Sequence, residues 1–278
     1  MKGKGGKGIS SRVLRGDRIA SGVGVVALSL VAGFISLPIL SLLLWTVSED
    51  SWRAMATPVA REALLLSVKT TSISMFFIIL IGTPAAYVLA RASFPGKRVV
   101  DSLVDIPAVL PPSAAGIALL LTFGRFGLLG EHLEAFGLTV SFTTTAVVLA
   151  EIFVASHFYV RQATVGFSQV RRDVEEAAMV DGAGRFSAFS RVTVPLAFPA
   201  LLAGAVMAWA RALGEFGGTI IFAGNFRGIT QTVPLAIYTQ LQSNFDAAVA
   251  LSVMVLGFAF TVILSARYLL RKAAELEV

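Results

Sequence analysis

The chain has 278 residues, of which 56% are hydrophobic and only 14% are charged, whereas a soluble domain usually carries about 25% charged residues. This balance excludes an ordinary soluble domain and favours a protein that crosses a membrane several times. The absence of cysteine excludes disulfides and thiolate metal sites, and the net charge of +6 raises the question of nucleic-acid binding.

The chain begins with a Gly/Lys-rich basic leader, residues 1–20, which we expect to be disordered and cytoplasmic. An uncharged apolar run follows at 22–46. It is too long for the apolar region of a cleaved signal peptide, and no clear cleavage site of small residues follows it. We therefore interpret this run as a retained first transmembrane helix.

Five further apolar segments follow, each near the roughly 20 residues that a helix needs to cross the hydrocarbon core. Four carry no charge, and the fifth is apolar apart from Glu151 and His157. The sequence thus predicts an all-α polytopic membrane protein in which 21–278 form a single transmembrane domain. The expected spans lie at 22–46, 70–90, 106–124, 142–160, 192–210 and 247–266.

The basic residues orient these spans, because cytoplasmic loops are enriched in Lys and Arg. With both termini inside, the leader, the loops after the second and fourth spans and the tail hold 17 of the 23 Lys and Arg residues. The outer loops hold Arg53, Arg61, Arg125 and Arg227. This asymmetry predicts cytoplasmic termini and explains the positive charge without nucleic acid.

The sequence lacks the motifs that would indicate an enzyme. The leader stretch GKGGKG is no P-loop, no H-E-x-x-H or G-x-S-x-G occurs, and His132 and His157 are too few for a histidine metal site. We expect no catalytic residue, metal or cofactor in this chain, and transport is the default function. An ion-coupled carrier is one alternative, although few ionisable residues lie in the spans, namely Lys69, Glu151, His157, Arg211 and Glu215.

A polar stretch at about 170–195, here called the elbow, separates the fourth and fifth spans. Val174, Ala177, Ala178 and Asp181 share one face of a predicted helix, which Gly182 can end by adopting a positive φ. A second short helix through Phe186, Phe189 and Val192 would follow, with Pro195 near the first turn of the fifth span. The elbow is either a socket for a partner or a simple connector.

The elbow resembles the EAA loop of binding-protein-dependent ABC importer permeases. The resemblance is carried by Glu176-Ala177-Ala178, by Gly182 and by the run Val192-x-Val194-Pro195, in which the two valines replace the usual Ile and Leu. The stretches DIPAVLPPSAAGIALLLTFGRFGLLG and ARALGEFGGTIIFAGNFRGITQTVPLAIYTQL look like the molybdate-type branch, and sulfate permeases are close relatives.

This resemblance implies a type I ABC importer permease, which works as a homodimer in the cell membrane. Two copies of a cytoplasmic ATPase would bind and hydrolyse Mg-ATP, and an extracytoplasmic oxyanion-binding protein would deliver molybdate or tungstate. Sulfate or thiosulfate is the alternative cargo. The residues implied in coupling to the ATPase are Glu175, Glu176, Ala177, Ala178, Asp181, Gly182, Ala183 and Gly184.

Residues of the pathway are harder to identify. Small residues recur every four positions at Ala200, Gly204, Ala208 and Ala212, which indicates either helix packing or the lining of the pathway. Arg211 and Glu215 lie one helical turn apart and could pair. The candidate pathway or gate residues are Ala208, Arg211, Glu215, Gly217 and Thr219.

Several other features have simpler interpretations. Pro107, Pro111 and Pro112 would kink the third span, either at a gate or through packing alone. A short outer helix is expected within 127–138. We expect Asp101 and Asp105 to be acids at a helix N-terminus. We interpret Arg161, Arg171 and Arg172 as determinants of orientation.

Overall fold

The computed structural model describes residues 8–46 and 53–275, so the first seven residues of the predicted leader lie outside it. Every long element within these ranges is a helix. In chain order they are α1 (Gly8–Trp45), α3 (Pro58–Arg91), α4 (Lys97–Val109), α5 (Pro112–Phe123), α6 (Gly130–Ala135), α7 (Thr144–Gln169), α8 (Arg172–Val180), α9 (Arg185–Ala188), the π-helical turn η1 (Phe189–Thr193), α10 (Val194–Leu213), α11 (Gly217–Phe222), α12 (Val233–Leu241) and α13 (Phe245–Glu275).

The predicted spans are present, with longer bounds. Within the described residues, four helices are long and apolar enough to cross a membrane, or five if α4 and α5 form one bent span. The remaining predicted span is α7, whose 26 residues make it about 39 Å long, enough for the hydrocarbon core. The expectation of a disordered leader is wrong from Gly8 onward, because α1 begins there.

The third predicted span, 106–124, is interrupted at its prolines, as the sequence predicts. The chain forms α4 and α5 there, and their axes differ by 117°. Two consecutive prolines explain the break, since neither can donate a backbone hydrogen bond. Leu110 precedes Pro111 and has the extended conformation (φ −65°, ψ 130°) that proline imposes on the residue before it.

The fifth span also begins earlier than expected. Helix α9, the turn η1 and α10 form one continuous helical stretch from Arg185 to Leu213, and Pro195 lies in the first turn of α10, as predicted. The π-helical turn η1 makes this possible. The Val194 N–H bonds the carbonyl of Phe189, and this wider spacing immediately precedes the proline that lacks an N–H.

Helix α7 is the centre of the fold, with α3 on one side and α10 on the other. Small residues allow this close packing: the ring of Tyr159 lies over Gly82 of α3, and Gly166 faces Ala197 and Ala200 of α10. Tyr159 also shares a 2.6 Å hydrogen bond with Thr83. The three helices therefore form one tightly packed unit.

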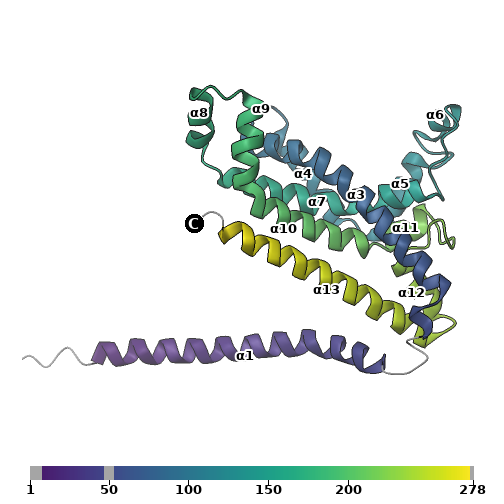
Figure 1. Cartoon of the computed structure of the whole chain (residues 1–278), viewed down its shortest axis with the longest axis horizontal. Coiled ribbons are helices and arrows are strands. Elements are labelled where there is room, and N and C mark those ends of the chain that lie inside the picture. Colours follow the sequence, from purple (N-terminus) through teal and green to yellow (C-terminus); the bar gives the residue numbers. More distant parts are fainter. Residues whose placement is uncertain (1–7, 47–52, 276–278) are drawn as a thin grey trace, which may run out of the picture.

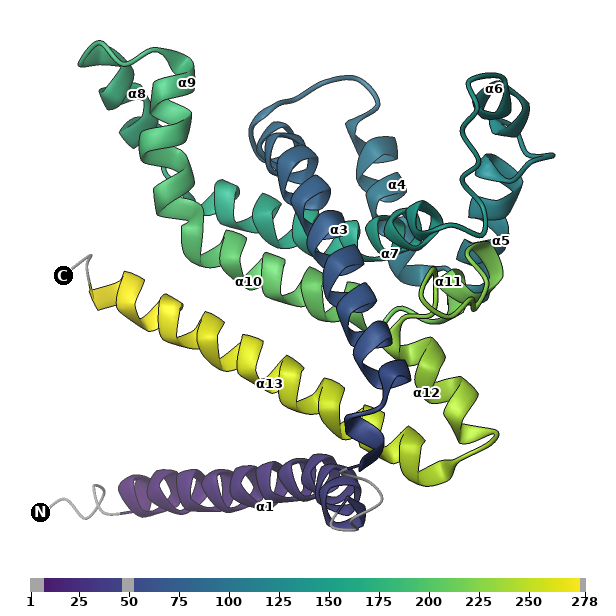
Figure 2. The ribbon, with the colours of Figure 1, turned by 45° about the vertical axis from the view of Figure 1, so that its right-hand side comes forward.

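The two ends of the molecule differ in character. Helices α8 and α9 lie at one end, together with the C-terminal end of α13 and the N-terminal end of α1 (Figures 1 and 2). Helices α6, α11 and α12 lie at the opposite end. The elbow therefore lies at the same end as the described start of α1 and the end of α13, all of which were predicted to be cytoplasmic.

The packing of α7 on α10 makes a testable prediction. In Gly166→Ala, the new Cβ would lie 2.5 Å from the Cβ of Ala200, which cannot rotate away, so the helices must separate. We expect a loss of about 1–3 kcal/mol of stability, as is usual for overpacking. Heating the purified protein and recording the fraction that stays monodisperse at each temperature would measure this loss of stability.

The matched control is Gly257→Ala on α13, where a Cβ meets nothing within 4 Å. Alanine is the better helix former by about 1 kcal/mol, so this variant should be neutral or more stable. Equal destabilisation by both variants would contradict the tight contact between α7 and α10.

Candidate functional site

The elbow begins with a short amphipathic helix, α8. Its first turn carries Asp173 and Glu175, and negative side chains are stabilised by the positive end of the helix dipole. Asp173 accepts a 3.1 Å hydrogen bond from the Val174 N–H and pairs with Arg171, whose guanidinium lowers the pKa of Asp173. Arg171 therefore contributes to the local structure of α8 as well as to the charge of this end.

A glycine turn ends α8, as the sequence predicts. Gly182 has φ +94°, its N–H bonds the carbonyl of Met179 at 3.1 Å, and the Ala183 N–H bonds the carbonyl of Ala178 at 3.0 Å. This pair of bonds is the Schellman motif, which needs a left-handed residue at the position of Gly182. A Cβ at Gly182 would meet nothing within 4 Å, so backbone conformation alone demands the glycine.

The carboxylate of Glu175 fastens the elbow to the spans. It accepts hydrogen bonds from Arg91 at 2.6 Å and from the hydroxyl of Thr193 at 2.8 Å, with the Tyr87 hydroxyl at 3.4 Å. Arg91 also donates to the carbonyl of Val170 at 2.8 Å. One buried carboxylate thus connects α3, the end of α7, α8 and η1.

Aromatic rings surround this hub. The ring of Tyr87 lies edge-on to Phe167 and Phe189, at centroid distances of 5.6 and 4.8 Å. Such contacts add to the stabilisation from apolar burial, by about 0.5–1.5 kcal/mol each. The carboxylate and its partners are therefore held in a rigid surrounding.

The other predicted coupling residues lie on the outward side of the elbow. Glu176, Ala177, Asp181, Gly182 and Gly184 are exposed, and Ala178 and Ala183 are partly exposed. Glu175 is the exception, since its side chain is only 12% exposed and points inward. It supports the elbow from within and does not form part of its outer surface.

Large apolar side chains accompany the exposed alanines. Val180 and Phe186 flank the glycine turn and are 86% and 81% exposed, and Met179 is 40% exposed. A hollow of about 500 Å³ opens beside them and reaches down to Tyr87 and Glu175. Exposed apolar groups on an otherwise polar loop, next to a hollow, are typical of a docking surface.

The stripe of small residues on α10 packs inside the subunit. A Cβ at Gly204 would lie 2.9 Å from Gln162, and Ala208 is fully buried in the core with α7. Packing therefore accounts for Ala208 and for its neighbours along the stripe. The exposed residues of α10 lie on other faces and include Leu196, Phe198 and Met207.

The remaining candidates for the pathway meet at the junction of α10 with α11. Arg211 and Glu215 form the expected ion pair at 2.7 Å, and the second carboxylate oxygen of Glu215 accepts the Gly218 N–H at 2.7 Å. Gly217 approaches Pro112 of α5 so closely that a Cβ would lie 2.6 Å from the proline ring. Thr219 is fully buried, and its hydroxyl has no hydrogen-bond partner.

The interpretation of Asp101 and Asp105 as acids at a helix N-terminus is wrong, because α4 begins at Lys97 and has no acid in its first turn. Arg161 of α7 donates to both carboxylate oxygens of Asp105, at 2.5 and 2.7 Å, and to Asp101 at 3.2 Å. No residue of α4 is buried, so this cluster is the main polar attachment of α4 to α7. The i,i+4 spacing of the two acids indicates that they share one helix face. It does not identify their partner, Arg161, which is remote in the sequence.

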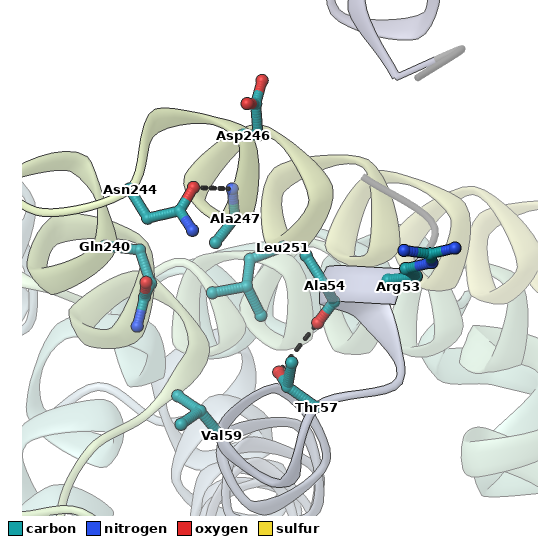
Figure 3. Close-up of a pocket in the computed structure, with 9 residues that line it drawn as sticks. All are labelled: Arg53, Ala54, Thr57, Val59, Gln240, Asn244, Asp246, Ala247 and Leu251. Carbon is teal, nitrogen blue, oxygen red and sulfur yellow. Dashed lines mark hydrogen bonds between the residues drawn. The ribbon is translucent and has the colours of Figure 1, made fainter. Parts of the chain in front are cut away.

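A polar hollow lies at the opposite end from the elbow. It has a volume of about 410 Å³ and is formed by the start of α3, the end of α12 and the start of α13. Its lining includes Gln240, Asn244, Thr57 and Arg53, and Asp246, whose carboxyl group points away from Thr57 in Figure 3. Thr57 and Asn244 are also the N-terminal capping residues of α3 and α13. Neither was singled out from the sequence.

The fold and the elbow define the class of this protein. Residues 78–275 match the family of binding-protein-dependent transport system inner membrane components, and the chain belongs to that family. It is therefore a membrane-embedded component of an importer that depends on a binding protein.

Individual relatives narrow the comparison. The chain is 42% identical over 241 residues to the molybdenum transport system permease protein ModB of Mycobacterium tuberculosis, covering 86% of this chain and 91% of that protein. It is 32% identical over 238 residues to a probable sulfate transport system permease protein cysT of Chlorokybus atmophyticus, covering 84% and 83%.

A solved structure shares the fold. A bacterial ABC transporter involved in the import of the acidic polysaccharide alginate superposes with a TM-score of 0.71 at 15% identity, covering 94% of this chain and 99% of that one. This similarity concerns the fold alone.

The Glu175 hub makes the second prediction. Glu175→Ala removes the acceptor for Arg91, whose side chain is only 13% exposed, and leaves that charge without its partner. Breaking such a pair costs about 3 kcal/mol. Hydrogen exchange of residues 171–193 should become markedly faster, while the exchange of α7 changes little.

Asp173→Ala is the control, since it removes an exposed carboxylate from the same helix. It should leave exchange in the elbow close to wild type. If Glu175→Ala exchanged no faster than Asp173→Ala, the hub would not hold the elbow in place.

Proposed function

We propose that this chain is the permease subunit of an importer for molybdate or a similar tetrahedral oxyanion. In this proposal two copies form the pathway, and each elbow binds one copy of a separate cytoplasmic ATPase. A binding protein outside the membrane delivers the anion to the end that carries α6, α11 and α12. The observation that carries the coupling role is the elbow itself, which exposes Val180 and Phe186 while Glu175 fastens it from within.

The geometry indicates how a force on the elbow would reach the spans. A partner that moves α8 would pull on Glu175, and through it on Arg91 of α3 and Thr193 of η1. Because η1 continues directly into α10, both helices that enclose α7 would follow. ATP and magnesium would bind to the ATPase, whose closure supplies the movement.

The identity of the cargo rests on the relatives. The sequence identity to the molybdenum permease is 42%, and that to the sulfate permease is 32% over a similar length. A transit pathway for an oxyanion needs hydrogen-bond donors more than a fixed counter-charge, because tight binding would slow release. Import of sulfate or thiosulfate is the alternative within the same class.

The first test is a pull-down of the purified chain with its ATPase, with ATP turnover followed in the same samples. Gly182→Asp forces a side chain into the left-handed turn, and Glu176→Lys reverses an exposed charge on the outward side. We expect both variants to lose at least tenfold in ATPase binding. Glu131→Lys on α6 makes the same charge change at the opposite end and should bind the ATPase normally.

Retained binding in both elbow variants would show that the elbow is only a connector. An ion-coupled carrier would then be favoured, with uptake that follows an ion gradient and ignores loss of the ATPase.

The cargo requires a separate measurement. In proteoliposomes, ATP turnover should rise with the molybdate-loaded binding protein and stay basal with sulfate. The reverse result would reassign the importer to sulfate and leave the coupling role of the elbow intact.

A further inference from the structure

A second buried carboxyl group, Glu151, takes no part in the coupling described above. It lies on α7, is 2% exposed, and faces α3. Burying an unpaired charge among apolar helices is costly, so such a residue needs compensating partners.

All the partners of Glu151 are hydroxyl groups from one stretch of α3. Thr70 and Thr71 approach one carboxyl oxygen, Oε1, at 2.8 and 3.4 Å. Ser74 approaches the other, Oε2, at 2.7 Å. Within the described residues, Glu151 has no Lys, Arg or His as a salt-bridge partner. Lys69 precedes these hydroxyls in the sequence, but its side chain is exposed.

Glu215 provides a direct contrast within the same protein. It is equally buried, at 2% exposure, but Arg211 lies 2.7 Å from one of its oxygens and the Gly218 N–H bonds the other. Both partners can only donate, which suits an ionised carboxylate.

The contacts of Ser74 favour the protonated form of Glu151. The Ser74 oxygen lies 2.7 Å from Oε2 of Glu151 and 3.2 Å from the carbonyl of Val148. Neither a carbonyl nor a carboxylate has a proton to give, and one hydroxyl proton cannot satisfy both. Both contacts become hydrogen bonds if Glu151 itself donates to Ser74.

We propose that Glu151 is held as the neutral carboxylic acid and acts as a positioning residue that joins α3 to α7. Its Oε2–H donates to Ser74, Ser74 donates to the carbonyl of Val148, and Oε1 accepts from Thr70. This arrangement pairs the carboxyl group without placing a charge among the spans. Together with the Glu175 hub near the other end of α3, the hydrogen bonds of Glu151 make α3 and α7 move together, whatever anion is transported.

Infrared spectroscopy of the full-length protein in lipid at pH 7 tests the protonation state. A carboxylic acid has a carbonyl stretching band that a carboxylate lacks. The wild type should show this band and Glu151→Gln should lose it, whereas the matched variant Glu215→Gln should keep it. A wild type without the band, or a band that survives Glu151→Gln, would overturn the proposal.

Thermal unfolding tests the positioning role separately. A glutamine side chain can donate to Ser74 and accept from Thr70, so Glu151→Gln should unfold within a degree or two of wild type. Glu151→Ala and Thr70→Val remove hydrogen bonds between Glu151 and α3, and both should lower the unfolding temperature by several degrees. A fall in Glu151→Gln as large as that in Glu151→Ala would show that the charge, and not the neutral hydrogen-bonded form, is needed.

Discussion

The hydrogen bonds on the Glu175 carboxylate set the relation between the elbow and the spans. A loop of exposed alanines and glycines has little apolar area to bury, so packing alone would leave it loosely attached. The carboxylate fixes the elbow instead, because Arg91 and Thr193 both donate to its Oε1 oxygen in a surrounding of aromatic rings. The outer surface of the elbow can therefore expose Val180 and Phe186, while its attachment depends on the inward-facing side chain of Glu175.

Similar polar contacts recur along the whole structure. In lipid the hydrophobic effect does little to hold one helix against another, so small residues and interhelical hydrogen bonds take its place. Helix α7 illustrates this: Glu151 and Tyr159 bond to α3, Arg161 bonds to α4, and Gly166 admits α10. Glu151, which interrupts this apolar span in the sequence, is thus one of the contacts that make α7 the centre of the fold.

Much of the architecture could be predicted from the sequence, and the failures share a cause. Charge-free runs gave the long spans, and Gly182 gave the end of α8, because hydropathy and backbone conformation are local properties. The bend between α4 and α5 was only partly foreseen, since prolines indicate a kink but not its angle. The partners of Glu175 and Arg161 could not be predicted, because Arg91 and Asp105 are more than fifty residues away and meet them only in the folded chain. Thr193 was likewise missed, as nothing local marks it.

The continuity of the helix from Arg185 to Leu213 has a mechanical consequence. Its 29 residues span about 43 Å from the elbow to the Arg211–Glu215 pair. The 20 residues of α10 beyond the π-helical turn are about 30 Å long, so a tilt of about 10° at that turn would displace the far tip by roughly 5 Å. The π-helical turn is at the base, where wider hydrogen-bond spacing and Pro195 weaken the backbone ladder and make it the natural fulcrum. A small rotation at the elbow is thereby amplified into a larger displacement at the opposite end of α10.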